Sequence, residues 1–367
     1  MAVVKVIGMD IYRYRVPLQI PLVFAETPLT QREGLIIQMT GDDHSVGLGE
    51  IAPLPGLSAE RLPEAQRQIL EVKDRLMNRQ IPPQVEELTW YFETWLRSWK
   101  LLNSVRCGLE MAILNLLANA NDRSVAELLG GPSRPQIMFS ALLSGTQKEV
   151  SRAIKKYLRL GVHSFKLKVG SNDIFVDIEK IILIHALLPK NCHLRIDANQ
   201  KWDYGQAGSF VKALDRSMVE YLEEPTKDNL LLDEFFKVTQ FPYALDESLN
   251  QLPKEKIKAL KGVKAFVLKP TLLGGFEKAM GWVRLAHELG IEAVISSSYE
   301  TGLGIRFLAQ FSSVATSAPA GLDTLKWFTK DLYDEELLIK EGCLLAESLS
   351  IEKNRIDFGM IEPVKNG

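Results

Sequence analysis

The chain has 367 residues, enough for two domains or for one barrel with an additional lobe. Hydrophobic residues make up 46% of it and the formal charge is −2, which is typical of a globular protein and excludes the basic excess of a nucleic-acid-binding protein. The first residues lack a signal-peptide pattern and no apolar run is long enough to span a bilayer, so we expect a cytoplasmic protein without membrane association. Three widely separated cysteines disfavour a disulfide framework.

The first third of the chain is predicted to form an α+β lobe. Residues 3–16 and 34–48 have strand character, and helical stretches follow near 59–77 and 85–99. A further helix carries apolar residues at helical spacing across 105–116, so one of its faces is apolar. Strand-rich sequence followed by helices is typical of an α+β unit.

After Pro132 the sequence alternates between strand and helix. Eight parallel strands with intervening helices favour a closed TIM-type barrel. An open doubly wound sheet is the alternative, but no Gly-x-Gly-x-x-Gly follows the first strand. The candidate strands are Ile137–Leu142, Ser164–Lys168, Leu194–Asp197, Val219–Glu223, Tyr243–Asp246, Ala265–Lys269, Glu292–Ser296 and a weaker one within Ser317–Leu322.

Ionisable residues end several of these candidate strands, just before turn residues. They are Lys166, Lys168, Asp197, Glu223, Asp246 and Lys269. Functional groups of such barrels gather at the C-terminal ends of the strands, so we expect these side chains to meet at one mouth. The sequence therefore predicts a site that combines three carboxylates with three amines.

The pleat of the strands decides which neighbouring residue faces inward. Because strand side chains alternate, Glu223 rather than Glu224 is predicted to point into the barrel. Asp246 is chosen over Glu247 because it stands at the end of its strand. By the same parity Arg195 lies beneath the aspartate two residues later.

Three inward carboxylates would repel one another strongly if they were dry and unpaired. A divalent cation resolves this repulsion, and an all-oxygen shell suits Mg²⁺ or Mn²⁺ rather than zinc. The five histidines show no paired-ligand spacing. A lysine close to another cation has its charged form disfavoured, so its pKa falls and the neutral amine can act as a base. The pattern indicates metal-assisted removal of a proton next to a carboxylate.

At this point the sequence resembles a known family. Lys-x-Lys, Asp-x-Asn, Glu-Glu-Pro, Asp-Glu-Ser and Lys-Pro-x-x-x-Gly-Gly, in this order, resemble the enolase superfamily in its muconate-cycloisomerase-like branch. Further segments at 49–58, 295–300 and 319–325 resemble the o-succinylbenzoate synthase family. The resemblance extends from about Arg32 to Leu325 and so covers most of the chain.

This resemblance implies an architecture. It implies a (β/α)7β modified TIM barrel at 132–329 with an N-terminal α+β capping domain at 1–131. We expect the segment 330–367 to complete the capping domain.

The resemblance also implies a reaction, the loss of water from 2-succinyl-6-hydroxy-2,4-cyclohexadiene-1-carboxylate to give 2-succinylbenzoate in menaquinone or phylloquinone biosynthesis. The implied Mg²⁺ ligands, with Mn²⁺ as another possible ion, are Asp197, Glu223 and Asp246. Lys168 would remove the proton next to the carboxylate and return it to the departing hydroxyl on the same face. Lys269 would stabilise the dienolate as a cation. Lys166 would lower the basicity of Lys168 and touch the carboxylate.

The substrate is a dicarboxylate, and its succinyl tail needs a binding site of its own. The candidates for contacts with substrate are Ser296, Gly321, Asn199, Arg195 and Arg32. Arg32 is equally compatible with a solvated loop position. The loops around 27–34 and 53–58 are expected to cover the barrel mouth and exclude water, as lids do.

Other functions remain open on the sequence alone. An N-succinylamino acid racemase or a dipeptide epimerase would use the same metal and both lysines. Such epimerases have an Asp-x-Asp at the eighth strand, whereas Asp323 has Leu322 and Thr324 beside it. A muconate-type lactonising enzyme, a Schiff-base aldolase and a non-catalytic barrel are the remaining alternatives, and the last would not need this set of strand-end charges. The sequence does not indicate the oligomeric state.

Overall fold

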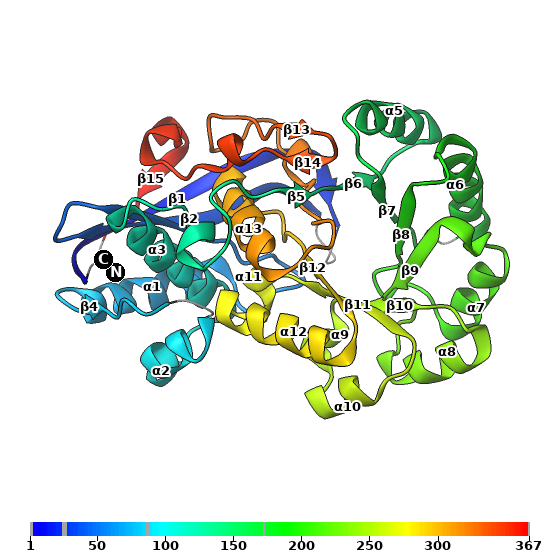
Figure 1. Ribbon diagram of the computed structural model, residues 1–367, viewed down its shortest axis with the longest axis horizontal. Coiled ribbons are helices and arrows are strands. Elements are labelled where there is room, and N and C mark those ends of the chain that lie inside the picture. The colour runs from blue at the N-terminus through cyan, green and yellow to red at the C-terminus, as the bar shows by residue number, and fades with distance from the viewer. Residues whose placement is uncertain (1–2, 24–27, 86–87, 172, 366–367) are drawn as a thin grey trace.

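A computed structural model describes residues 3–23, 28–85, 88–171 and 173–365, and it confirms the α/β fold (Figure 1). Antiparallel strands β1 and β2 lie on one side of the molecule, and a curled parallel sheet with helices on its outer face lies on the other. The structure thus has an N-terminal cap against a barrel.

The cap is built on antiparallel strands in the order β15-β1-β2-β3, with β4 also paired to β1. Its N-terminal elements are β1 (Val4–Leu22), β2 (Leu29–Gly41), β3 (Val46–Ile51), α1 (Leu62–Leu76), β4 (Gln80–Ile81), α2 (Tyr91–Leu96), α3 (Asn103–Ala120) and α4 (Val125–Leu128). The prediction of one strand segment at 34–48 was wrong, because β2 and β3 form a hairpin there. Turn-forming residues at 41–45 reverse the chain, and Thr40 pairs with Val46. The second predicted helix is also shorter than expected, and residues 86–87 lie outside the described ranges.

Helix α3 packs directly on β3 because that strand carries glycines at the contact. A Cβ atom on Gly49 would lie 2.1 Å from the carbonyl oxygen of Gly108, and one on Gly47 would lie 2.2 Å from that of Ala112. Backbone atoms cannot move aside cheaply, so a larger residue at either position would push the helix off the sheet. This close packing fixes the end of β3, where Glu50 stands.

The C-terminal segment returns to both parts of the molecule. Strand β15 (Ile361–Pro363) pairs with β1 of the cap, and β13 (Ile339–Lys340) and β14 (Cys343–Leu344) form a small sheet with β5 (Ile137–Met138). The first predicted barrel strand, Ile137–Leu142, is therefore divided. Its first two residues pair with β14, and the chain changes sheets at Phe139, whose N–H donates to Gly342.

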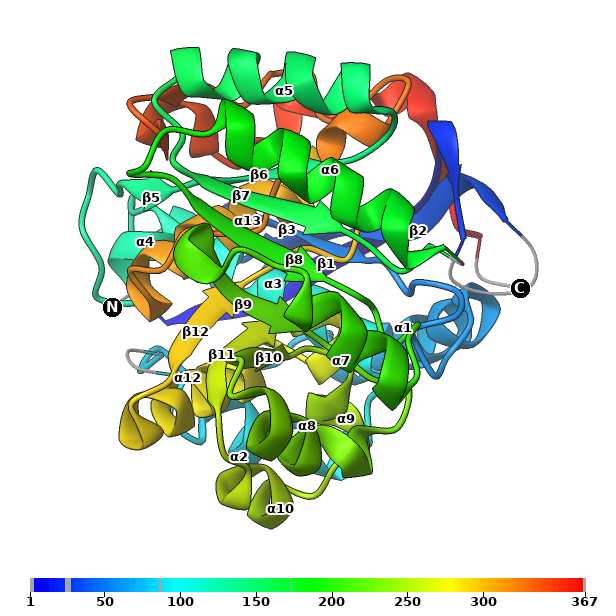
Figure 2. The same cartoon turned by 90° about the vertical axis from the view of Figure 1, so that its right-hand side faces the viewer.

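Within the described part of the chain, the parallel strands are hydrogen-bonded in the order β12-β11-β10-β9-β8-β7-β6 (Figure 2). They are β6 (Ser140–Leu143), β7 (Ser164–Lys168), β8 (His193–Asp197), β9 (Val219–Glu223), β10 (Tyr243–Leu245), β11 (Val263–Leu268) and β12 (Glu292–Ile295). The expected eighth strand is reduced to two bridging residues. Ala320 bridges to Phe139 and Gly321 bridges to Ser296, so this short segment joins the two ends of the sheet.

Helices follow the strands in turn. They are α5 (Gln147–Arg159), α6 (Ile174–Leu187), α7 (Tyr204–Lys212), α8 (Leu232–Thr239), α9 (Ser248–Gln251), α10 (Lys254–Ala259), α11 (Pro270–Leu273), α12 (Phe276–Leu289) and α13 (Gly302–Ala315). Of these helices, α5, α6, α7 and α8 cover the outer face of the parallel sheet (Figure 2). Two of them begin with a capping box, at Thr146 for α5 and at Asp203 for α7. None of the helices formed by the described residues has the length and apolar character needed to cross a bilayer.

A buried carboxylate joins the cap to the barrel. Glu50 of β3 accepts hydrogen bonds from the backbone N–H groups of Thr301 and Gly304, both at 3.0 Å, at the N-terminus of α13. It also accepts one from the hydroxyl of Tyr14 at 2.6 Å. Burial and the nearby carboxylate of Glu300 raise the pKa of Glu50 to about 7, and its hydrogen bonds only partly oppose this.

We expect this carboxylate to make stability depend on pH. Because the folded state holds the proton of Glu50 more tightly than the unfolded state, the stabilisation is complete below pH 4.5 and is lost as pH rises through about 7. The substitution Glu50→Gln mimics the protonated form, so the variant should gain up to ~3 kcal/mol relative to the wild type over that range. Urea unfolding of both proteins at pH 4.5 and pH 8 measures the difference, and a constant difference would contradict the expectation.

Candidate active site

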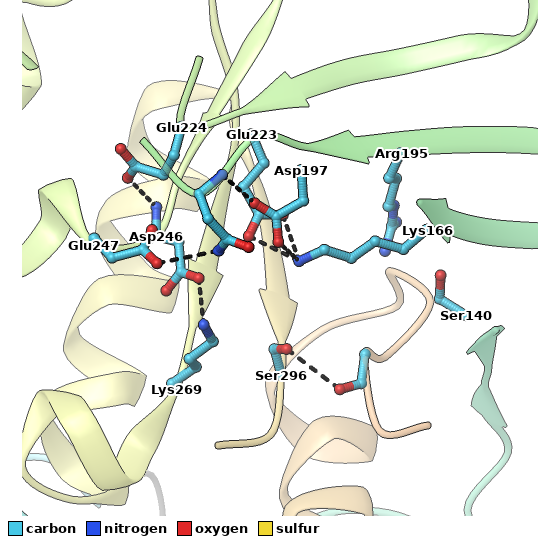
Figure 3. Close-up of polar contacts among 12 residues, drawn as sticks. Ser140, Lys166, Arg195, Asp197, Glu223, Glu224, Asp246, Glu247, Lys269 and Ser296 are labelled. Atoms are coloured by element: carbon cyan, nitrogen blue, oxygen red, sulfur yellow. Dashed lines mark hydrogen bonds and ion pairs between the residues drawn. The ribbon is translucent and has the colours of Figure 1, made fainter. Parts of the chain in front are cut away.

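The ionisable residues at the strand ends meet at the C-terminal mouth of the barrel, and Figure 3 shows Lys166, Asp197, Glu223, Asp246 and Lys269 there. Lys168 of β7 pairs in register with Asp197 of β8, which in turn pairs with Glu223 of β9. Asp246 and Lys269 come directly after β10 and β11. Parallel strands end on the same side of the sheet, so the pattern in the sequence becomes a cluster in space.

The ammonium group of Lys166 lies between two of the carboxylates. Its Nζ atom is 2.9 Å from Oδ2 of Asp197 and 2.8 Å from both oxygens of Glu223. Burial opposes the charge of this lysine, but the carboxylates outweigh burial and raise the pKa of Lys166 well above its ordinary value. In return, although burial acts in the other direction, the lysines lower the pKa of Asp197 to about 2.

The carboxyl group of Glu223 responds differently. Burial and the charge of Asp197 hold the pKa of Glu223 well above its ordinary value, although Lys166 acts against them. Lys269 forms an ion pair with Asp246, which follows the neighbouring strand β10. Burial disfavours the charge of Lys269, but Asp246 and Glu247 outweigh burial and raise the pKa of this lysine. Burial and the neighbouring carboxylate thus outweigh the lysines at Glu223, whereas the lysines outweigh burial at Asp197.

Glu224 points away from the mouth and holds the loop that carries Asp246. One of its oxygens accepts hydrogen bonds from the backbone N–H of Asp246 at 2.7 Å and of Ser248 at 2.8 Å. The other accepts from the Ser248 hydroxyl and from Gln200, both at 2.7 Å. The pleat thus separates the two adjacent glutamates, with Glu223 facing the lysine and Glu224 facing the loop (Figure 3).

Glu247 belongs to the site although the sequence analysis set it aside. Its Oε1 accepts a hydrogen bond from Nδ2 of Asn199 at 3.3 Å. Burial, together with the charges of Asp246 and Asp197, raises the pKa of Glu247 to about 8. The residue lies beyond the end of β10, where alternation along a strand no longer predicts which side chain turns inward.

The donor groups fit a hard divalent cation. Oδ2 of Asp197 and Oε2 of Glu223 are buried and lie 2.9 and 2.8 Å from Nζ of Lys166, and the buried Oε2 of Glu247 accepts no hydrogen bond. Buried carboxylate oxygens of this kind are the ligands that Mg²⁺ and Mn²⁺ prefer. No group of three His, Cys, Asp or Glu residues within the described ranges is already gathered as a metal centre. Here Lys166 and Lys269 are instead paired with the carboxylates.

A cavity opens between these charges and the last strands of the barrel. Its lining residues are Leu54, Ser140, Leu142, Lys166, Lys168, Asp197, Asn199, Lys269, Ser296, Ser297, Ser298, Tyr299, Gly321, Asp323 and Thr324. The candidate contacts Ser296, Gly321 and Asn199 are therefore at the cavity wall. The hydroxyl of Ser296 donates to the carbonyl of Gly321 at 3.3 Å, and the N–H of Asn199 donates to Asp197 at 3.0 Å.

The two candidate arginines do not line this cavity, and their contact with the substrate remains a prediction. Arg195 is buried lower in the barrel, where it binds Glu220 at 2.6 Å and the carbonyl of Pro319 at 2.7 Å. Arg32 is 1% exposed and donates to backbone carbonyl groups of the cap and of the barrel. Neither arginine lines the cavity, because each is engaged in joining segments of the fold.

Of the two loops predicted to cover the barrel mouth, the structure places the one at 53–58 beside the cavity. Leu54 of the loop at 53–58 lines the cavity, and Leu57 lines an adjoining outer cavity that also includes Lys168 and Lys201. Of the other expected loop, residue 27 lies outside the described ranges, and β2 begins at Leu29.

Comparison with known proteins places these residues in a family. Residues 149–350 match the family described as enolase C-terminal domain-like, and residues 7–116 match the N-terminal domain of the MenC family. An o-succinylbenzoate synthase from Yersinia enterocolitica is 33% identical, over 86% of this chain and 89% of that protein. The chloroplastic protein PHYLLO of Arabidopsis thaliana is 30% identical over 89% of this chain, but the match covers only 21% of that longer protein.

A solved structure shares the whole architecture. The dipeptide epimerase from Cytophaga hutchinsonii, described as a complex with Mg and the dipeptide D-Ala-L-Val, superposes with a TM-score of 0.80. The match covers 99% of each chain at 20% sequence identity. At this identity the similarity establishes the fold and leaves the substrate open.

Proposed function

Because this chain is an enzyme that belongs to the o-succinylbenzoate synthase family of the enolase superfamily, we propose that it dehydrates 2-succinyl-6-hydroxy-2,4-cyclohexadiene-1-carboxylate to 2-succinylbenzoate. The reaction serves menaquinone or phylloquinone biosynthesis and takes place in the cytoplasm. The substrate is a small dicarboxylate, in keeping with a cavity whose wall carries three lysines and neutral polar groups beside the carboxylates of Asp197 and Asp323.

The observation that carries this proposal is the placement of two amines on opposite sides of one mouth. Lys168 ends β7 and Lys269 follows β11, and these are the second and sixth strands when the described ring is counted from β6 through the bridging segment at 320–321. Second and sixth positions face each other across a ring of eight. A flat ring substrate held between them presents one face to each amine.

In the proposed reaction Lys168 removes the proton next to the ring carboxylate. It then returns a proton to the departing hydroxyl on the same face, so the elimination is syn. Lys269 remains an ammonium group and stabilises the negative charge of the dienolate from the other face. Lys166, whose ammonium group bridges Asp197 and Glu223, contacts the substrate carboxylate. Aromatisation of the ring favours the second step, so the first deprotonation is the demanding one.

Asp197, Glu223 and Asp246 would hold Mg²⁺ or Mn²⁺, with Glu247 turned toward the same space. When bound there, the cation would neutralise the substrate carboxylate and the charge that develops on it. The succinyl tail would lie toward Ser296 and the backbone of Gly321, which are neutral polar groups of the cavity wall. Asn199 would contact the substrate from the side of the carboxylates, where it is hydrogen-bonded to Asp197 and Glu247.

The proposed activity is tested by adding the cyclohexadiene substrate and following 2-succinylbenzoate by absorbance. We expect formation with Mg²⁺, loss after EDTA and recovery when Mg²⁺ is restored. Trapping with borohydride should have no effect, which separates this reaction from Schiff-base chemistry. Activity that persists in EDTA would contradict the proposal.

Racemisation or epimerisation of N-succinylamino acids or dipeptides is the second candidate, since both lysines are also what two-face proton exchange requires. Asp323 bears on the choice. Its carboxylate accepts from the N–H of Leu142 at 2.9 Å and the hydroxyl of Tyr157 at 2.8 Å, and it is also paired with Lys326. Although Asp323 lines the cavity, its oxygens are already engaged, which disfavours the binding of a substrate amine. Incorporation of deuterium from D₂O into N-succinyl amino acids would reveal this activity.

A further inference from the structure

Tyr299 is a cavity residue to which the sequence analysis gave no role. Its ring centroid lies 6.0 Å from Nζ of Lys168, the amine proposed as the base. The side chain is 6% exposed and lines both the inner cavity and the adjoining outer cavity. The ring of Trp327 meets it edge-on, with centroids 6.0 Å apart and planes at 89°. Tyr299 is therefore a firmly packed aromatic wall beside the base.

The backbone of Tyr299 is in an unfavourable conformation. Its φ angle is +60°, in the left-handed region that residues with a Cβ atom rarely adopt. Such a conformation persists only when the surrounding structure holds it. The carbonyl oxygen of Tyr299 accepts a hydrogen bond from Nε of Arg32 at 3.0 Å, and this bond comes from a strand of the cap.

The same guanidinium group also holds the cap loop. Nη1 of Arg32 donates to the carbonyl of Pro53 at 2.9 Å, and Nη2 donates to that of Ala52 at 3.0 Å. The rigid fork of an arginine can make these bonds together, whereas a lysine offers only a point donor. One buried side chain thus connects the loop before Leu54 to the loop that presents Tyr299.

We propose that Tyr299 is a positioning residue for Lys168, and that Arg32 acts through it by fixing the loop in the conformation that turns the ring toward the amine. The four-carbon stem of a lysine is flexible, and a ring face beside it restricts the amine to one side of the cavity. The ammonium formed when Lys168 takes the substrate proton then faces an aromatic ring. The inference rests on the proposed function, because the role of Lys168 as base is part of that proposal.

The test compares two substitutions at one position. Tyr299→Phe keeps the ring and should retain kcat within ~3-fold, whereas Tyr299→Leu should lower kcat by ~10-fold or more with a smaller change in KM, as misplacement of a reacting group does. The matched control is Tyr333→Leu, which removes another buried aromatic ring. The centroid of that ring lies 3.9 Å from Cζ of Arg306, and Tyr333 does not line the cavity. This variant should leave kcat unchanged. Equal losses in the Phe and Leu variants would overturn the role of the ring.

A second readout does not need the reaction. Reductive methylation with ¹³C-formaldehyde gives each lysine an NMR signal, and the Lys168→Arg variant identifies the signal of Lys168. In the wild type the ring current of Tyr299 should displace this signal, and in Tyr299→Leu it should move toward the signals of exposed lysines. An unmoved signal overturns the inference. A displaced signal in a protein that forms no 2-succinylbenzoate would count against the proposed function alone.

The role of Arg32 is tested by coupling. Arg32→Lys should increase amide hydrogen exchange at 52–54 and 298–300 and lower kcat by about as much as Tyr299→Leu does, because both act on the same amine. The kcat of the double variant Arg32→Lys, Tyr299→Leu should then be no lower than that of the slower single variant. Losses that multiply would show that Arg32 does not act through Tyr299.

Discussion

Substitution of Lys168 by alanine should lower the rate of dehydration by ~10³-fold or more while the protein remains folded, because the general base and its placement are both lost. The residue ends β7 beside Asp197, and its side chain is only partly buried, so its removal leaves no large cavity. Lys168→Arg should be as inactive as Lys168→Ala, because a guanidinium stays charged and cannot accept the proton.

Substitutions of Lys269 should give a different result, which distinguishes its role from that of Lys168. If this residue acts as a cation, Lys269→Arg should keep part of the activity that Lys269→Ala loses. The control is Lys264→Ala, near the start of the strand β11 that Lys269 follows, where the exposed amine pairs with Glu292 at 3.2 Å. Steady-state kinetics of these variants, with circular dichroism to verify folding, checks the assignment. Full activity in Lys168→Ala would reject its role as the base.

The second large effect concerns the carboxylates. Asp246→Asn should weaken Mg²⁺ binding and lower Mg²⁺-dependent activity by ~10²-fold or more, because a neutral amide oxygen replaces a charged ligand. Metal binding has a readout besides activity. A ligand that binds only the folded state at 100 times its Kd stabilises that state by about 2.7 kcal/mol, so Mg²⁺ should raise the Tm of the wild type.

The same titration in Asp246→Asn should produce a much smaller increase in Tm at equal Mg²⁺ concentration. Asp233→Asn is the matched control, since Asp233 pairs with Lys237 at 3.0 Å on the surface of α8, away from the mouth. It should respond to Mg²⁺ as the wild type does. A wild-type protein whose Tm does not respond to Mg²⁺ or Mn²⁺ would contradict the metal site.

Much of the barrel could be predicted because each strand carries a local signal. A short apolar run that ends in a charged residue and a turn predicts a strand. It also predicts that the charged side chain lies at the C-terminal end of that strand, as Asp197 and Glu223 do. The alternation of side chains along the strand also predicted that Glu223 and Glu224 point in different directions, as they do. This alternation is a local property of the strand, so it can be predicted without knowing the neighbouring strands. The domain boundaries and the roles of the site residues remain predictions.

The parts that sequence patterns missed depend on long-range contacts. Whether Ile137 and Met138 belong to the barrel is decided by β14, about 200 residues later in the chain. From the sequence alone, Arg32 is equally compatible with an exposed loop position. Its burial depends on hydrogen bonds to the carbonyls of Pro53 and Tyr299, which only the folded chain brings together. Tyr299 gives no sign in the sequence of its left-handed backbone, which the surrounding contacts impose.

The way the ring of strands closes has a consequence for how such an enzyme could change its substrate. The seam at Ala320 and Gly321 consists of a few backbone hydrogen bonds to Ser140, Ile295 and their neighbours, in place of a full strand ladder. The lysines and carboxylates stand on the opposite, continuous arc of the wall. Mutations at the seam can therefore reshape the region next to Ser296 without loosening the strands that carry the reactive groups, so selectivity and chemistry can evolve independently in this architecture.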